Sequence, residues 1–226
     1  MIKNEVVIIG AGAAGSTAAF HLAKKGINVT CLEKQSSNQF KCCGGGISSS
    51  VQNLFDFDLE PIIEEVIREV HFTWNLDDEV KAKLPGSAPF WIVKRENLDN
   101  LILTKAINAG AHFLSPFTVE NIEWRNYQWE VTDDNGEKLT AKCIIIADGS
   151  LSKWPSIFGL GPKNKNQART ISIRAKKRGD ISNGIAKFEF GLVKNGFAWV
   201  FPIKNGLNIG MGTFIGRKTN NNLETL

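Results

Sequence analysis

The sequence predicts an α/β fold in which a three-layer domain built on a parallel sheet is interleaved with an antiparallel β-sheet domain. Residues 6–25 predict a short apolar strand, a glycine-rich turn and a helix. A continuous apolar strand of this kind is typical of a parallel sheet, in which the strands are buried on both faces. From residue 167 onward, short alternating apolar and polar segments are separated by Gly and Asn, which is typical of antiparallel strands. We expect a first domain over residues 1–65 and 95–165, and a second, β-rich domain over residues 66–94 and 166–226.

Composition sets few limits on function. The chain has 226 residues, and its 27 Lys and Arg against 23 Asp and Glu leave a net charge of +4. We interpret the basic clusters at residues 163–165 and 174–178 as solvated surface, and expect no nucleic-acid partner. No apolar run is long enough to span a bilayer, and no signal peptide opens the chain. We therefore expect a cytoplasmic protein, at the periphery of a membrane if its substrate is a lipid.

The opening unit has the form of a dinucleotide-binding site. The apolar residues 6–9 run directly into Gly-Ala-Gly-Ala-Ala-Gly at residues 10–15, then into a helix closed by Gly26. A second strand follows and ends at Glu33. Strand, glycine turn, helix, strand and acid in this order are typical of a Rossmann-like domain, whereas the glycine pattern alone is weak evidence.

Each part of this unit has a mechanical reason. Gly10 permits the tight turn, Gly12 lets the backbone approach a pyrophosphate, and Gly15 lets the helix lie close to the strand. The helix N-terminus offers N–H groups to the phosphates. A carboxylate at Glu33 can accept hydrogen bonds from ribose hydroxyls and would repel a 2′-phosphate, so FAD or NAD fits and NADP does not. The cofactor-binding residues predicted here are Gly10, Gly12, Ala13, Ala14, Gly15, Glu33 and Lys34.

A loop of cysteine and glycine follows at residues 41–47, Lys-Cys-Cys-Gly-Gly-Gly-Ile. Three glycines can expose backbone N–H groups to a flat ligand, and the alternative is a flexible linker. A helix is expected from Ile47 to Phe55. The adjacent cysteines lack a second pair at zinc-ligand spacing, so no metal site is expected. The other two cysteines, Cys31 and Cys143, lie in apolar strand patterns and are expected to be buried.

The middle of the chain is mixed. Residues 66–74 and 79–84 predict a hairpin with its turn at residues 76–78, and residues 90–93 a further strand. A helix is expected to start at residues 94–99 and to run to about Asn108. Arg95 falls in its first turn, where the helix dipole disfavours a cation. A phosphate or ribose of the cofactor is one possible partner for Arg95, and a plain surface position is the alternative.

A β-meander is expected over residues 118–147, with a hairpin turn at Asn135-Gly136. Its last strand ends in Asp148 and Gly149, which places a carboxylate at the carboxyl end of the sheet, where such folds bind ligands. The alternative is that Asp148 or Ser150 only caps a helix over residues 151–158; both roles are compatible.

Three large rings alternate in the strand near residue 200. Phe197, Trp199 and Phe201 are expected on one face of that strand. The pattern alone favours an ordinary aromatic row of the core.

Together these features resemble the geranylgeranyl reductase family of FAD-dependent oxidoreductases, within the flavoprotein group shaped like the aromatic hydroxylases. Residues 43–46, Cys-Gly-Gly-Gly, are similar to the family's Pro-Cys-Gly-Gly-Gly loop, and residues 197–202 to its Tyr-x-Trp-x-Phe-Pro strand. Arg95 and residues 147–149 match the group's arginine and Asp-Gly motifs. The resemblance adds to the cofactor site Gly44, Gly45, Gly46, Arg95, Asp148 and Gly149.

The sequence departs from that family at several points. Cys42 replaces the usual Pro, and Phe197 replaces the usual Tyr. The family's late Gly-Asp motif, which opens a helix after an apolar strand, has no match, because Gly179-Asp180 lies in a basic loop. We therefore expect both domains to be incomplete at the C-terminus.

The resemblance implies reduction of carbon–carbon double bonds of an isoprenoid chain by hydride from reduced FAD, with NAD(P)H or ferredoxin as the electron donor. Cys43 is the candidate for supplying the proton or shaping the site; a structural role is equally open. Phe197, Trp199 and Phe201 would line the path of an apolar substrate. The alternatives are a flavin-dependent monooxygenase or halogenase-like enzyme, and an inactive truncated flavoprotein fragment.

Overall fold

The computed structural model describes residues 3–35, 41–161, 168–176 and 183–214. The chain divides into two compact units. The first contains residues 1–40 and 96–163, and the second contains residues 41–95 and 164–226.

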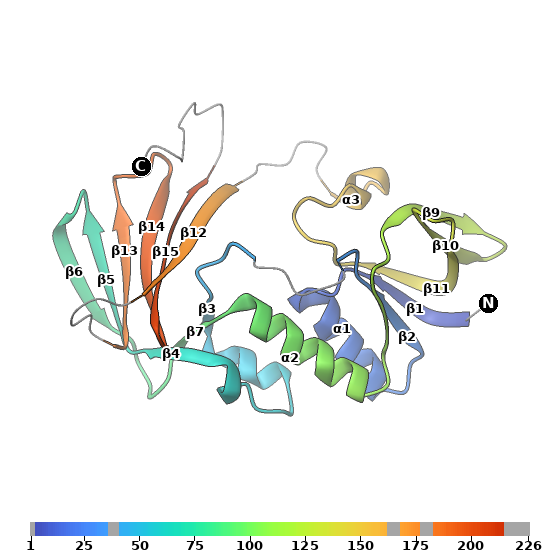
Figure 1. Ribbon diagram of the computed structural model, residues 1–226, viewed down its shortest axis with the longest axis horizontal. Coiled ribbons are helices and arrows are strands. Elements are labelled where there is room, and N and C mark those ends of the chain that lie inside the picture. The colour runs from blue at the N-terminus through green and yellow to red at the C-terminus, as the bar shows by residue number, and fades with distance from the viewer. Residues whose placement is uncertain (1–2, 36–40, 162–167, 177–182, 215–226) are drawn as a thin grey trace. The chain divides into compact units, whose positions relative to one another are not determined.

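The first unit is built on a six-stranded sheet with the order β8-β2-β1-β11-β10-β9. Figure 1 labels β1, β2, β9, β10 and β11 of this sheet, together with the helices α1, α2 and α3. The strands β8, β2, β1 and β11 run parallel to one another, whereas β11, β10 and β9 form the antiparallel meander. The α/β class predicted from the sequence is therefore confirmed. The strands are β1 Lys3–Ile9, β2 Val29–Leu32, β8 His112–Leu114, β9 Val119–Arg125, β10 Gln128–Asp133 and β11 Lys138–Ile146; the helices are α1 Ala13–Lys24, α2 Arg95–Asn108 and α3 Trp154–Ile157.

Strand β11 belongs to both halves of this sheet. Residues 138–141 pair with β10, and residues 143–146 pair in parallel with residues 6–9 of β1. Within the described ranges, no strand pairs with the outer edge of residues 143–146. The expectation that Cys143 is buried was wrong, since this side chain is exposed. An apolar run predicts burial only where the strand is covered, and the pairing with β10 ends at Ala141.

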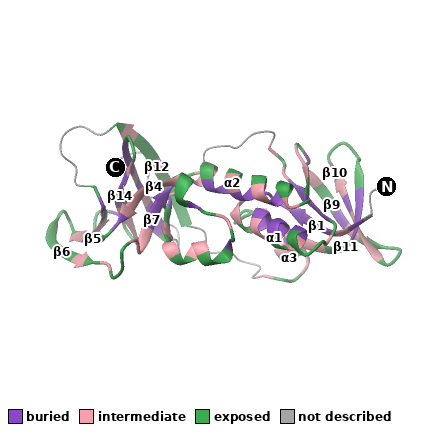
Figure 2. Ribbon diagram, turned by 90° about the horizontal axis from the view of Figure 1, so that it is seen from below, coloured by how far each residue is buried: buried purple, intermediate pink, exposed green. Residues whose placement is uncertain are grey.

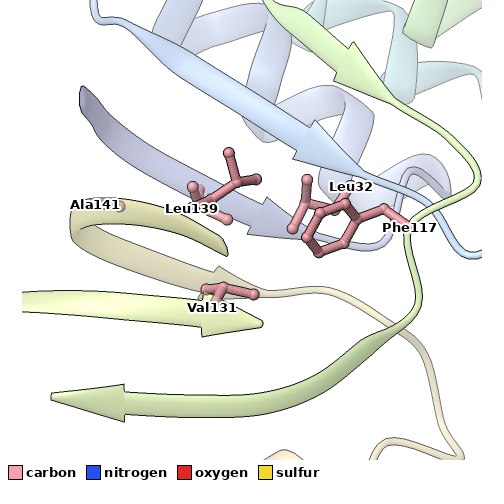
Figure 3. Packing of buried hydrophobic residues seen from close by; sticks show 6 residues of the cluster. Leu32, Phe117, Val131, Leu139 and Ala141 are labelled. Carbon is pink, nitrogen blue, oxygen red and sulfur yellow. The ribbon is translucent and has the colours of Figure 1, made fainter. Parts of the chain in front are cut away.

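A core cluster of apolar side chains lies between the two halves of this sheet (Figure 3). Leu32 from the parallel part packs with Val131 and Leu139 from the meander, and Phe117 closes the cluster. Val7 and Val131 have no exposed surface. Burial of such side chains contributes roughly 1.5–3 kcal/mol each, so the meander is an integral part of the first unit.

The second unit contains a six-stranded sheet with the order β12-β15-β14-β13-β5-β6 and a three-stranded sheet with the order β3-β7-β4. Every pair of the large sheet is antiparallel except β13 with β5, which is parallel. The predicted β-rich character of this region holds, with that one exception to antiparallel pairing. The strands are β3 Gly46–Ser48, β4 Ile63–Ile67, β5 Glu69–Trp74, β6 Asp77–Lys83, β7 Phe90–Val93, β12 Ala168–Lys176, β13 Ile185–Phe190, β14 Gly196–Ile203 and β15 Gly206–Phe214.

Residues 41–65 fall in the second unit, because β3 and β4 both pair with β7. The sequence-based domain boundaries at residues 65 and 95 stay a prediction. Figure 2 shows buried residues on β7 and β14. Their side chains, including Ile92, Trp199 and Phe201, form the core of this unit.

Local details differ from the sequence expectation at three places. The helix expected over residues 47–55 is β3 followed by the 3-10 helix η1, Ser49–Leu54, whose N-cap Ser48 accepts a hydrogen bond from Ser50 N; a second 3-10 helix, η2, spans Glu60–Ile62. The turn before β6 is formed by Asn75 and Leu76, both at positive φ, one residue earlier than expected. The helix expected over residues 151–158 is reduced to the four residues of α3. No helix in the described part of the chain is long and apolar enough to cross a lipid bilayer.

The turn between β10 and β11 gives a pH-dependent prediction. Asp133 Oδ1 accepts hydrogen bonds from Asn135 N at 3.0 Å and Glu137 N at 2.7 Å. Burial opposes ionisation, but these bonds outweigh it and lower the pKa of Asp133 below its ordinary value of 3.8. A depressed carboxyl pKa contributes stability that is present above the unfolded-state pKa and is lost as the pH falls through the folded-state pKa.

We therefore expect an Asp133→Asn variant to be less stable than the parent protein at neutral pH, and the difference to shrink as the pH falls below about 4. Urea unfolding of both proteins across pH 3–7 measures this difference. A constant difference over that range would contradict the assignment to the ionised carboxylate.

Candidate functional site

The glycine turn after β1 is built by close backbone approaches. Gly10 has φ +98°, and a Cβ atom there would lie 2.5 Å from the carbonyl oxygen of Ala147. A Cβ atom on Gly15 would lie 1.8 Å from the carbonyl oxygen of Gly10. Both distances are far below a van der Waals contact, so only glycine fits either position. The structure thus confirms the strand-to-helix junction that the sequence predicted at residues 10–15.

The N-terminus of α1 carries no side-chain cap. Its N-cap residue is Gly12, and the first turn contains no acidic residue. Free N–H groups and the positive end of the helix dipole therefore remain available to an anion, as in pyrophosphate-binding folds. Ala13 is half-buried and Ala14 is exposed in this first turn.

Glu33 lies beside this turn. Its Oε2 accepts a hydrogen bond from Ala11 N at 3.1 Å, and its Oε1 accepts one from Gln35 N at 3.2 Å. The carboxylate is thus fixed at the end of β2 with lone pairs left over for ribose hydroxyls. Lys34 is exposed, and its role in cofactor binding stays a prediction.

Cys31, on β2, forms a hydrogen bond with the backbone of the glycine turn, and the sequence did not predict this role. Its Sγ donates a weak hydrogen bond to the carbonyl oxygen of Gly10 at 3.6 Å. Burial, and secondarily the charge of Glu33, raise the pKa of the Cys31 thiol to about 12. The thiol therefore stays protonated and can donate this bond at physiological pH.

Asp148 lies directly after β11, against the glycine turn. A Cβ atom on Gly10 would lie 2.7 Å from Asp148 Cα. Asp148 Oδ1 is buried and has no hydrogen-bond partner among the described residues. A buried carboxylate oxygen without a donor is costly. A ligand hydroxyl or N–H group would satisfy it, and Gly149 at φ +93° turns the chain away at this point.

These features fit the adenosine diphosphate part of FAD. The uncapped N-terminus of α1 would hold the pyrophosphate, Glu33 the ribose, and Asp148 a donor group of the cofactor. All of these residues belong to the first unit. The structure therefore brings together Gly10, Gly12, Ala13, Ala14, Gly15, Glu33, Asp148 and Gly149.

The cysteine–glycine loop belongs to the second unit. It packs closely against neighbouring strands and is hydrogen-bonded by one side chain. Gly45 has φ +79°, and a Cβ atom there would lie 2.0 Å from the carbonyl oxygen of Val93. A Cβ atom on Gly44 would lie 2.8 Å from the Phe201 ring. The loop is thus packed between β7 and the aromatic strand β14. The linker interpretation is wrong for Gly44 and Gly45, since linker glycines do not need such fixed positions.

Asn208, on β15, fixes this loop to the sheet. Its Nδ2 donates to the carbonyl oxygens of Cys43 at 2.8 Å and Gly44 at 3.2 Å, and its Oδ1 accepts from Trp199 Nε1 at 3.3 Å. This residue was not predicted from the sequence. Asn is depleted in the middle of strands. Its presence within a predicted strand was therefore the feature of the sequence that could have marked Asn208 as a residue with a specific role.

The aromatic row of β14 lies on one face, as the alternation predicted. The ring centroids of Phe197 and Trp199 are 6.0 Å apart, and those of Trp199 and Phe201 are 6.3 Å apart. Trp199 and Phe201 are each only 5% exposed and belong to the core of the second unit. Their role toward a substrate stays a prediction, as does that of the half-buried Phe197.

Two further predictions stay open. Gly44, Gly45, Gly46 and Arg95 lie in the second unit, and their contribution to a cofactor site is a prediction. Cys43 is half-buried on the loop, with its Sγ accepting a hydrogen bond from Gly45 N at 3.4 Å; its catalytic role is likewise a prediction. Gly179-Asp180 and the basic cluster at residues 163–165 lie outside the described residues.

Comparison with known proteins agrees with this geometry. A protein of Methanosarcina barkeri described as uncharacterized is 31% identical over 94% of this chain and 54% of its own length. Digeranylgeranylglycerophospholipid reductase 2 of Methanothermobacter thermautotrophicus is 26% identical over 93% of this chain and 57% of its own length. The chain thus spans about half the length of the curated relatives it matches.

Among solved structures, a geranylgeranyl bacteriochlorophyll reductase-like protein from Thermoplasma acidophilum superposes with a TM-score of 0.79 at 22% identity. The alignment covers 94% of this chain and 57% of that protein, and at this identity it shows the shared fold. A family model described as pyridine nucleotide-disulphide oxidoreductase matches residues 4–180, which include the glycine turn, Glu33 and Asp148. On that match, the chain belongs to the pyridine nucleotide-disulphide oxidoreductase family.

Proposed function

We propose that this chain supplies the dinucleotide site and the substrate-facing lobe of an FAD-dependent oxidoreductase. The observation that carries the proposal is the cluster at the carboxyl end of the parallel sheet. There an uncapped helix N-terminus, the Glu33 carboxylate and the unsatisfied Asp148 Oδ1 lie around one glycine turn. The geometry suits a ligand with a pyrophosphate, a ribose and a hydrogen-bond donor.

The residues of the chain would bind and orient the cofactor. The N–H groups of the first turn of α1 would face the phosphates, and the Glu33 carboxylate would favour an unphosphorylated ribose over a 2′-phosphate. When bound, reduced FAD supplies hydride. NAD(P)H and ferredoxin are the candidate electron donors.

We propose an isoprenoid chain as the substrate and an isolated carbon–carbon double bond as the reduced group. The support comes from the names of the relatives and from the cysteine–glycine loop, which packs against the aromatic strand in the second unit. An unactivated alkene is a poor hydride acceptor, so positioning and proton delivery carry much of the reaction. Cys43 is the candidate for delivering the proton or shaping the site. Such a substrate would bring a cytoplasmic enzyme to the periphery of a membrane.

The binding test is a Glu33→Gln variant. The substitution keeps the shape of the side chain and removes the charge that accepts from Ala11 N and the ribose. Hydrogen bonds to a charged group contribute about 1.5–3 kcal/mol, so we expect FAD affinity to fall by roughly 10- to 100-fold. Titration of flavin fluorescence measures it, with the exposed Glu120→Gln as a matched control. Equal affinity in both variants would contradict the assigned ribose site.

The activity test uses purified protein with chemically reduced FAD and a phospholipid carrying geranylgeranyl chains. Mass spectrometry should show the gain of two hydrogen atoms for each reduced double bond. Binding of FAD with a chloride-dependent product on an aromatic substrate would favour a halogenase-like enzyme instead. Protein that binds no FAD would contradict the whole proposal and favour an inactive fragment.

A further inference from the structure

Two adjacent thiols lie on the cysteine–glycine loop of the second unit. Cys42 is exposed and Cys43 is half-buried. Reagents in solution can therefore reach the first thiol directly, and the second is its immediate neighbour in the chain. Cys31 differs sharply, because burial raises the pKa of its thiol to about 12 and leaves it unreactive.

Each of the two thiols has its own hydrogen-bond partners. Thr170 Oγ1, on β12, donates to Cys42 Sγ at 3.4 Å, and Ser172 Oγ lies 3.3 Å from the same sulfur. Gly45 N donates to Cys43 Sγ at 3.4 Å. The reduced loop is therefore held on two sides, by β12 through Cys42 and by its own backbone through Cys43.

We propose that Cys42 and Cys43 form a reversible modification site, in which a low-molecular-weight disulfide such as oxidised glutathione converts the two thiols to a vicinal disulfide. The Cys42 thiolate attacks one sulfur of the oxidant, forming a mixed disulfide and releasing one thiol. The Cys43 thiolate then attacks Cys42 Sγ and releases the second thiol. Two protein thiols lose two protons and two electrons, and the oxidant is reduced to two thiols.

The geometry makes this bond easy to reverse. Adjacent Cα atoms are about 3.8 Å apart across a trans peptide, which is shorter than the separation of about 4.4–6.8 Å that disulfides normally span. A strained disulfide is more readily reduced than a structural one. The pair is therefore suited to a modification that follows the surrounding redox state rather than to a permanent crosslink.

Closing the bond would also change how the loop is held. Cys42 Sγ must leave Thr170 and Ser172, and Cys43 Sγ must leave Gly45 N. Asn208 remains bonded to the carbonyl oxygens of Cys43 and Gly44. Oxidation would then free the loop from β12 while leaving it attached to β15. All of these residues belong to the second unit, so the modification site does not depend on the proposed cofactor or substrate.

The test is carried out on the full chain in a Cys143→Ser background, which removes the exposed lone thiol. The protein is equilibrated in glutathione buffers of increasing oxidised fraction, alkylated, digested and analysed by mass spectrometry. We expect the peptide carrying both cysteines to lose two hydrogen atoms in a single step. Cys42→Ser and Cys43→Ser variants should instead keep one glutathione adduct. Two independent adducts in the parent, or two free thiols in fully oxidised buffer, would overturn the proposal.

A second variant tests the contacts themselves. Thr170→Val with Ser172→Ala removes the hydroxyls that hold Cys42 Sγ in the reduced state. Loss of such bonds should raise the equilibrium constant for disulfide formation by about 3- to 10-fold. Ile171→Val, between these two positions on the same strand, is the control and should leave the constant unchanged. An unchanged constant in the double variant would show that β12 does not hold the reduced loop and would overturn that part of the proposal.

Discussion

A Gly10→Ala variant should lose about 3 kcal/mol or more of unfolding free energy and should no longer bind FAD. The new Cβ atom would lie 2.5 Å from the carbonyl oxygen of Ala147 and 2.7 Å from Asp148 Cα. Both are backbone atoms, so β11 or the glycine turn must move. Forced overpacking of this kind costs typically 1–3 kcal/mol, and the positive φ of Gly10 adds about 1–2 kcal/mol for a residue with a side chain.

The matched control is Gly110→Ala. Gly110 has φ +106°, close to the +98° of Gly10, but a Cβ atom there would meet nothing within 4 Å. The control therefore carries the conformational strain without the clash. Urea unfolding and FAD titration of both variants separate the two effects. Equal destabilisation by the two substitutions would show that the close approach of β11 to the turn is not the reason for glycine at position 10.

An Asn208→Asp variant is expected to destabilise the second unit by about 3 kcal/mol and to release the cysteine–glycine loop. The substitution is nearly isosteric but replaces the donors to the carbonyl oxygens of Cys43 and Gly44 with a carboxylate. Asn208 is 4% exposed, so the new charge would be buried facing two acceptors. Leaving a buried group unpaired costs about 1–3 kcal/mol, and more when the group is charged.

Asn205→Asp provides the control, because Asn205 is exposed in the turn between β14 and β15. Thermal unfolding should shift only for Asn208→Asp, and proteolysis of that variant should cut within residues 41–46 faster than in the control. If the two variants unfold alike, the loop is held by its packing against Phe201 rather than by the amide of Asn208.

The parts of the fold that the sequence predicted well are those encoded by neighbouring residues. The junction at residues 10–15 depends on glycines within one turn, and the start and end of α2 and β7 depend on local apolar spacing. Glu33 could be placed because its distance from the turn is fixed by one helix and one strand. Local physics therefore sufficed for the geometry of the glycine turn and of Glu33, on which the proposed dinucleotide site depends.

The parts that the sequence did not predict depend on pairing between distant segments. β3 and β4 pair with β7, and no local pattern in the sequence reveals that pairing. Asn208 acts on a loop that lies 164 and 165 positions away in the chain. Cys143 is exposed because β10 stops short of it. Each of these outcomes is set by tertiary contacts that override local propensity.

Strand β11 links the meander to the proposed cofactor site through its register. One end of the strand is aligned by β10, and the other end leads directly into Asp148 beside the glycine turn. Because side chains alternate along a strand, a slip of one residue would turn each side chain of β11 to the opposite face. The hairpin at Asn135-Gly136 therefore determines which residue follows β11 beside the glycine turn of the proposed nucleotide site.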